Sequence, residues 1–333
     1  MRRLVFVLGL VATSVMAAPR GSGSTGCLEG GWALGSAPRD GQFLVDLIEW
    51  NQRFTPSDRL HIVFNNVFSL SSPSTAPTVA NNSVNYFSQF RLQTDTANTY
   101  FFTMANAGAY LDYRILDGLT VALGHMRTPF GAESVLSRYD TAAYFYSSSF
   151  RQAQAQGWLW DLGVLFTLKR RWIPGELTLG VLDGKAATGQ GSPSVVARYE
   201  ASLDIGRYTL VPSGSLYVGN FPGASNDLGF TLGLEALLGA FSLQAEWVQV
   251  DDATSTHTRS LYFEPAIDLG VAEVAAKADF QTQGTTSDMH LSFALTKMLT
   301  QRLRARALFQ MAGLNGNIRA GERDFRILIG ADW

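Results

Sequence analysis

Three arginines stand at alternate positions near the end of the chain: Arg302, Arg304 and Arg306. Side chains of an extended strand alternate between its two faces, so this spacing places all three on one face. Like charges this close repel one another, and the group therefore requires an anionic solute or acidic neighbours. Asp288 and Asp324 are candidate neighbours. The sequence leaves both possibilities open, solute binding and neutralisation by the adjacent strands.

A second group of charges lies in the long stretch 128–156 and comprises Glu133, Arg138, Asp140 and Arg151. If this stretch folds toward the three arginines, opposite charges face one another across a narrow passage. Such an arrangement creates a transverse field that orders water and polar solutes. We therefore predict that these seven residues line a constriction. Aromatic residues of the same stretch either stack on sugar rings or pack it against a wall: Tyr144, Phe145, Tyr146 and Phe150.

Residues arranged for catalysis are sparse. The sequence contains neither G-x-S-x-G nor H-E-x-x-H, and its four histidines have no metal-ligand spacing. Asp288, His290 and Ser292 share one strand face, but residues two apart in a strand stand about 6–7 Å apart, too far for a direct triad. We predict no enzymatic activity, no metal and no cofactor.

The elements that position these residues are predicted from alternation with period two, which runs to the last residue. In the terminal segment, Phe325, Ile327, Ile329 and Trp333 share one face. Comparable blocks of about ten residues recur, the length of a strand that crosses a bilayer at a tilt. We count sixteen of them: 42–53, 59–70, 86–95, 100–115, 119–128, 157–168, 175–183, 194–204, 208–218, 228–238, 241–250, 258–268, 271–281, 286–296, 302–312 and 323–333.

Composition and connections distinguish two all-β architectures. Only 16% of the 333 residues are charged, and the charges are confined to one face of most strands. A soluble sandwich would also alternate, but lipid would enforce this confinement, since a charge at mid-bilayer costs about 2–4 kcal/mol. Short and long connections also alternate, as in outer-membrane barrels. We predict a closed antiparallel transmembrane β-barrel of about 16 strands (14–18) over 41–333, with 128–156 folded inward.

The N-terminus has the pattern of a secretory signal, with Arg2 and Arg3 before an apolar run from Leu4 to Ala18. We predict a signal peptide over 1–17 and an N-terminal segment over 18–40. Cys27 is the single cysteine, which excludes a disulfide scaffold. Export and the slight acidic excess, 28 acidic against 26 basic residues, disfavour nucleic-acid binding.

Two motifs resemble those of bacterial outer-membrane porins. The strand ending at Trp333 resembles the C-terminal signal read by the outer-membrane assembly machinery. The segment LTVALGHMRTPFG from Leu119 to Gly131, followed by Ala132 and Glu133, resembles the strand-and-loop entry of phosphate-selective and related carbohydrate porins. The long stretch after it corresponds in position to the loop that such porins fold into the lumen.

The resemblance implies a channel for passive diffusion of small hydrophilic solutes and ions across the outer membrane. It also implies a homotrimer surrounded by outer-membrane lipid and lipopolysaccharide, and delivered by the assembly machinery. Phosphate-selective relatives are expected to carry lysine clusters, whereas this chain has four lysines and many acidic lumen positions, so a weakly selective pore fits better. A barrel enzyme that hydrolyses lipid, and an adhesive or structural barrel with a plugged lumen, remain as alternatives. Five aromatic residues are predicted to form interfacial girdles or to pack in the core: Trp158, Trp160, Trp172, Tyr208 and Trp333.

Overall fold

The computed structural model describes most of the chain as β-structure. The described residues are 22–33, 42–71, 87–93, 99–135, 141–143, 147, 148, 150, 153, 158, 160–170, 174–184, 193–219, 227–251, 257–314 and 317–332. The predicted signal peptide 1–17 lies outside them.

In the described part of the chain the strands follow one another, and a short 3-10 helix, η2, lies at Glu133–Val135. Their bounds are β1 Ser22–Ala33, β2 Gln42–Ser57, β3 Leu60–Ser71, β4 Phe87–Gln93, β5 Thr99–Leu116, β6 Leu119–Arg127, β7 Trp160–Lys169, β8 Glu176–Leu182, β9 Ser194–Glu200, β10 Leu203–Ile205, β11 Tyr208–Gly219, β12 Asp227–Leu238, β13 Phe241–Asp251, β14 His257–Asp268, β15 Glu273–Gln283, β16 Thr286–Met298, β17 Leu303–Leu314 and β18 Asn317–Asp332. No described helix is long and apolar enough to cross a membrane.

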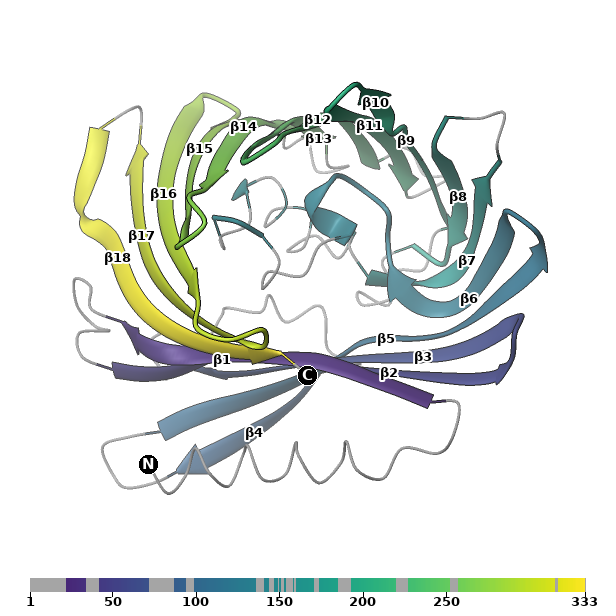
Figure 1. The fold of residues 1–333 in the computed structure, drawn as a ribbon, viewed down its shortest axis with the longest axis horizontal. Coiled ribbons are helices and arrows are strands. Elements are labelled where there is room, and N and C mark those ends of the chain that lie inside the picture. Colours follow the sequence, from purple (N-terminus) through teal and green to yellow (C-terminus); the bar gives the residue numbers. More distant parts are fainter. Residues whose placement is uncertain are drawn as a thin grey trace.

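These strands form a closed antiparallel barrel with 16 members in the ring, as predicted. The ring closes where β18 pairs with β1, with Cys27 opposite Asp332. Two of the elements add no member to it. Strand β10 continues β9 along the same edge of β11, and β4 pairs with the part of β5 that extends past β6. Figure 1 shows the ring with β4 lying off it.

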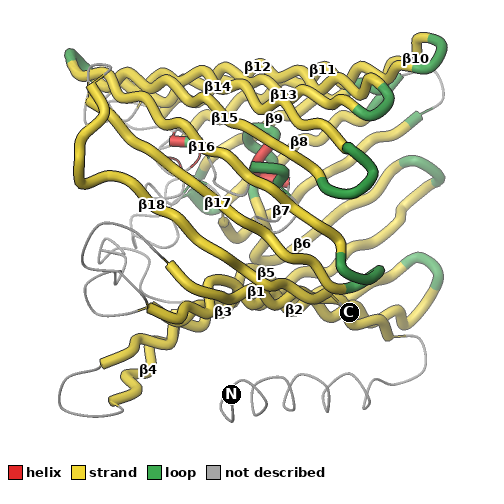
Figure 2. The backbone as a smooth tube through the Cα atoms, turned by 60° about the vertical axis from the view of Figure 1, so that its left-hand side comes forward, coloured by secondary structure: helices red, strands yellow, loops and turns green. Residues whose placement is uncertain are grey.

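The predicted count of sixteen is correct through two differences that cancel. The alternation does not predict β1, which lies within 18–40, and it counts 86–95 as a ring strand although β4 is not one. Because β4 belongs to the connection between β3 and β5, the long connections all fall at one end of the barrel. Most of the tight turns lie at the other end (Figure 2). The hairpins between β15 and β16 and between β17 and β18 are the exceptions. This is the sidedness of outer-membrane barrels.

One predicted long loop is short. The sequence pattern places a loop at 312–322, whereas β17 extends to Leu314 and β18 begins at Asn317. The register shifts between Met311 and Gly313, so the hairpin contains an irregularity that the alternation does not show.

The two faces of the strands differ as the alternation predicts. On β12, Leu228, Phe230 and Leu232 are exposed on the outer surface, whereas Asp227 and Thr231 are fully buried on the inner face. An outer surface of this kind is suited to lipid, because it places apolar side chains outside and polar ones within.

Two prolines interrupt the ladder without changing its register. The pairing of β14 with β15 skips from Phe263 to Ala266 around Pro265. The pairing of β11 skips in the same way around Pro212, which is where β9 ends and β10 begins. Proline has no N–H to donate, so each ladder loses a bond at that point.

Candidate functional site

The segment that follows β6 lies inside the barrel, as Figure 1 shows. At Gly131 it is bound to two strands. The N–H of Gly131 donates to Ser215 Oγ of β11 at 2.8 Å, and its carbonyl accepts from Arg198 Nη1 of β9 at 2.7 Å. Gly131 has φ +81°, and a Cβ there would lie 3.3 Å from a carboxylate oxygen of Glu246. Only glycine combines this backbone geometry with so close an approach. The predicted inward fold of 128–156 is observed for the part that the structure describes.

Three acidic residues on consecutive strands hold the backbone of this inward loop. Glu246 of β13 accepts the N–H of Ala132 at 2.8 Å, and Glu264 of β14 accepts that of Ala143 at 2.9 Å. Asp279 of β15 accepts the N–H of Ser148 at 2.6 Å. A carboxylate on the barrel wall can thus accept hydrogen bonds from the backbone N–H groups of a loop. Such a contact does not depend on the side chains of the loop. The sequence places all three on the lumen face, but it gives no sign that a loop covers them.

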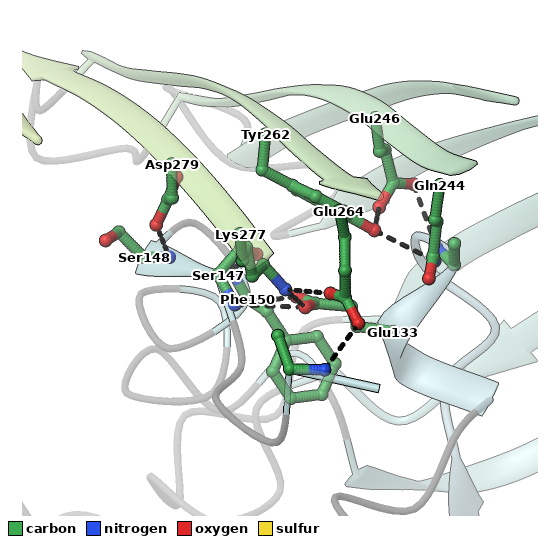
Figure 3. Close-up of polar contacts among 12 residues, drawn as sticks. Glu133, Ser147, Ser148, Phe150, Gln244, Glu246, Tyr262, Glu264, Lys277 and Asp279 are labelled. Carbon is green, nitrogen blue, oxygen red and sulfur yellow. Dashed lines mark hydrogen bonds and ion pairs between the residues drawn. The ribbon is translucent and has the colours of Figure 1, made fainter. Parts of the chain in front are cut away.

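A buried ion cluster lies at the centre of these contacts. Lys277 of β15 is paired with Glu133 of the loop and, at 3.0 Å, with Glu264. Its ammonium group also lies 4.2 Å from the ring centre of Tyr262. Figure 3 shows Lys277 pointing between the two carboxylates. The sequence predicts Glu133 as a constriction residue, but it does not single out Lys277 as its partner.

Within this cluster Glu133 also binds the loop to itself. Its carboxylate accepts from both the N–H and the hydroxyl of Ser147, at 2.9 and 2.5 Å. Burial raises the pKa of the Glu133 carboxyl, and the charge of Lys277 acts in the opposite direction. Since Glu133, Glu264 and Lys277 are each at most 4% exposed, no water screens their charges. The position of the loop therefore depends on this pairing.

Apolar packing supplements the polar contacts on the other side of the loop. Trp158 is 1% exposed and stacks on Tyr217 of β11, with ring centres 4.5 Å apart. The loop contributes Phe130, Phe150, Ala153 and Trp158 to a cluster with Leu182, Val196, Tyr217, Val248 and Val250. The girdle prediction is therefore wrong for Trp158, because the inward loop carries it away from the outer surface. Phe150 packs the loop against the wall of the barrel, which is one of the two alternatives given for the aromatic residues of this stretch.

Small residues allow the middle of the loop to reach the far wall. Ala142 packs against a second cluster, on the inner faces of β14 to β18, formed by Ala266, Ala275, Ala294, Leu308 and Leu328. Three of these five wall residues are alanines, which leave room for the loop backbone. The loop therefore extends across the lumen from β9 toward the wall that carries the predicted arginines.

The arginines divide between the inner face and the turn. Arg306 is buried on the inner face of β17 and donates from Nε to Thr296 Oγ1 at 3.1 Å. Arg304 shares that face, whereas Arg302 is exposed in the turn before β17. Arg326 of β18, which is not among the predicted constriction residues, is also buried on the inner face. Arg138, Asp140 and Arg151 lie outside the described residues.

Acidic residues occupy the opposite wall. Glu176 of β8 and Glu200 of β9 face each other across the ladder, and Arg198 pairs with Glu200 at 2.5 Å. In the ring of sixteen, β8 and β9 stand eight places from β17 and β18, which is half the circumference. The two glutamates and the arginines Arg304 and Arg306 all lie toward the tight-turn end of their strands. The two signs of charge thus face each other across that end of the lumen.

The remaining predicted residues lie apart from this site. Ile327 and Ile329 of β18 are exposed on the outer surface and Phe325 shares their side, while Trp333 lies outside the described residues. Trp160 is half-buried beside Arg127, whose guanidinium lies 4.7 Å from its ring centre. Tyr208 is exposed at the turn after β10, and Trp172 is not among the described residues.

Within the described part of the chain, no cluster of histidine, cysteine and acidic residues could hold a metal ion.

Comparison with known proteins finds similarity of fold and none of sequence. No protein-family model and no curated protein matches the sequence. An anion-selective porin from Comamonas acidovorans superposes with a TM-score of 0.60 at 10% identity, covering 93% of this chain and 98% of the porin. The chain has the porin fold.

Two further structures support this assignment of the fold. OprB of Pseudomonas putida gives a TM-score of 0.59 at 10% identity, over 98% of this chain and 96% of OprB. OmpT, an outer membrane protein of Vibrio cholerae, gives a TM-score of 0.60 at 9% identity, over 95% of this chain and 99% of OmpT. Together with the apolar outer surface, the porin fold makes this chain a β-barrel of the outer membrane.

Proposed function

We propose that the chain forms a water-filled channel for passive diffusion of small hydrophilic solutes and ions across the outer membrane. The observation that carries the proposal is the loop seated on the inner walls of β13, β14 and β15. A barrel of sixteen strands is wide enough to leave an aqueous channel. A loop fixed to one side narrows such a channel.

The charges at the tight-turn end of the lumen support a pore of mixed character. Arg304 and Arg306 lie on one wall, and Glu176 and Glu200 lie half a circumference away. A field between them orders water and favours polar solutes over apolar ones. Since both signs are present, we expect weak ion selectivity. Diffusion of this kind requires no nucleophile, so we propose no enzymatic activity for the barrel.

The decisive experiment is single-channel recording of purified protein in planar lipid bilayers. We expect discrete conductance steps near the nanosiemens scale. Folding is checked in the same preparation by the shift in electrophoretic mobility between unheated and boiled samples, and the boiled sample is the negative control. Well-folded protein that gives no steps would overturn the proposal and favour a plugged or catalytic barrel.

Two features of assembly accompany the proposal. The outward-facing side chains of the last strand are proposed as the signal for the assembly machinery, and the barrel is proposed to associate as a homotrimer in a lipid and lipopolysaccharide bilayer. Crosslinking of the protein in native outer membranes measures the second feature. A product of three chains supports it, and monomer alone contradicts it.

A further inference from the structure

A hollow lies on the outer surface of the barrel, away from the lumen and its loop. It has a volume of about 490 Å³ and spans the outer faces of β13, β14, β15 and β16. These four strands are consecutive neighbours (Figure 2). The hollow lies toward the end of the barrel at which the long connections are found, which is the external side of an outer-membrane barrel.

The wall of the hollow nearer the membrane centre is a single apolar row. Trp247 pairs with Leu261, Leu261 with Phe280, and Phe280 with Met289. Leu261 and Phe280 are exposed. A row of large apolar side chains provides a surface on which an acyl chain can lie.

The next row toward the exterior is polar and has the same straight register. Gln249 pairs with Arg259, Arg259 with Thr282, and Thr282 with Ser287. With neighbouring strands about 4.8 Å apart, the row is about 15 Å wide. It places one guanidinium group, two hydroxyls and one amide along a line at which the surface changes from apolar to polar. The amide is bonded to Asp251, and the Thr282 hydroxyl donates to the carbonyl of Arg259 at 3.5 Å.

Arg259 supplies the positive charge of this row. Its side chain is exposed, and among the described residues no acidic group forms an ion pair with it. The nearest outward acid, Asp251, is already engaged by Gln249 at 2.6 Å and by His257 at 2.9 Å. Asp288 also lines the hollow, but it shares a strand face with the buried Ser292, so its side chain points toward the lumen. The arginine therefore remains available to an anion at the membrane surface.

We propose that this hollow binds a phosphate-bearing lipid of the outer leaflet. The phosphate is held by Arg259 with the hydroxyls of Thr282 and Ser287, and an acyl chain lies over Phe280 and Met289. Arginine forms bidentate, charge-assisted bonds with phosphate, which a neutral headgroup cannot accept in the same way. An ordinary lipid-facing crevice would be filled by any acyl chain and would show no preference for phosphate.

The test is lipid binding by purified trimer or monomer in mild detergent, measured by native mass spectrometry. The probes are a diphosphorylated lipid A and the same lipid with both phosphates removed. We expect the wild type to retain the phosphorylated probe at least tenfold better than the dephosphorylated one. The variant Arg259→Gln should lose this preference.

Arg207→Gln is the matched control, because Arg207 is also exposed but lies at the tight-turn end. It should bind like the wild type. Phe280→Ala should weaken the binding of both probes, since it removes apolar contact with the acyl chain and leaves the charge of Arg259 in place. Equal retention of the two probes by the wild type, or unchanged preference in Arg259→Gln, would overturn the proposal. Arg259 lies outside the lumen, so its substitution should leave conductance unaltered, and failure of the channel proposal would remain a separate result.

Discussion

Lys277 of the barrel wall is ion-paired with Glu133 of the inward loop, although the two residues stand 144 positions apart in the sequence. Lys277 also binds Glu264, so one cation serves two buried carboxylates. The pairing is therefore asymmetric. Loss of either carboxylate leaves Lys277 with a partner, whereas loss of Lys277 leaves two negative charges buried together.

We predict that Lys277→Met displaces the loop, whereas Glu133→Gln is milder. Removal of one partner from a buried ion pair costs about 3–5 kcal/mol, because the other charge is left uncompensated. The displaced loop should give larger and noisier conductance steps in planar bilayers. Glu133→Gln keeps the shape of the side chain and leaves the pair between Lys277 and Glu264. Equal conductance in Lys277→Met and wild type would show that the ion cluster does not position the loop.

Gly131→Ala should change the channel more than it changes the barrel. The substitution costs about 1–2 kcal/mol for a left-handed backbone, and it also brings the new Cβ to 3.3 Å from Glu246. Gly239 provides the control, because it has φ +74° in a tight turn and nothing within 4 Å of an added Cβ. Both alanine variants should lower the thermal midpoint of unfolding. Only Gly131→Ala should alter conductance, and a change of conductance in Gly239→Ala would contradict this assignment.

Reversal of charge at Arg304 should shift ion preference. Arg304 lies on the inner face of β17, so Arg304→Glu adds negative charge to the lumen wall, and the channel should become more cation-selective. The reversal potential in a salt gradient measures the effect. Arg59→Glu is the control, since Arg59 is exposed in the turn between β2 and β3. An unchanged reversal potential in Arg304→Glu would remove this residue from the selective region.

Trp158→Ala should loosen the apolar side of the loop. Truncation of a buried aromatic side chain costs about 3–5 kcal/mol, through lost burial and the cavity left behind. Here it also removes the stack on Tyr217. Trp158→Phe retains most of the packing and should be intermediate. Conductance noise and susceptibility of the loop to protease are the readouts, and an alanine variant that behaves like wild type would mean that polar contacts alone hold the loop.

The sequence alone determined the class of fold and the two faces of the wall. Alternation is a local property, because successive side chains of a strand point to opposite sides whatever the strand pairs with. Hence the inner positions of Arg304, Arg306 and Lys277 could be predicted. The same local rule could not decide which segments join the ring. Alternation did not predict β1, and it counted the segment that contains β4 as a strand of the ring. Membership of the ring depends on a pairing partner far along the chain.

Only the tertiary structure decided what the inner charges do. On the sequence, Glu246, Glu264 and Asp279 are three lumen-facing acids among many, but in the fold they bind the backbone of the loop. Which acids are covered depends on where the segment after β6 lies inside the barrel, and no periodicity encodes that path. The sequence thus determined which face of a strand a charge occupies, although Arg302 lies in a turn and not on the strand. The closure of the ring and the path of one loop decided which charges hold the loop and which remain on the wall opposite it.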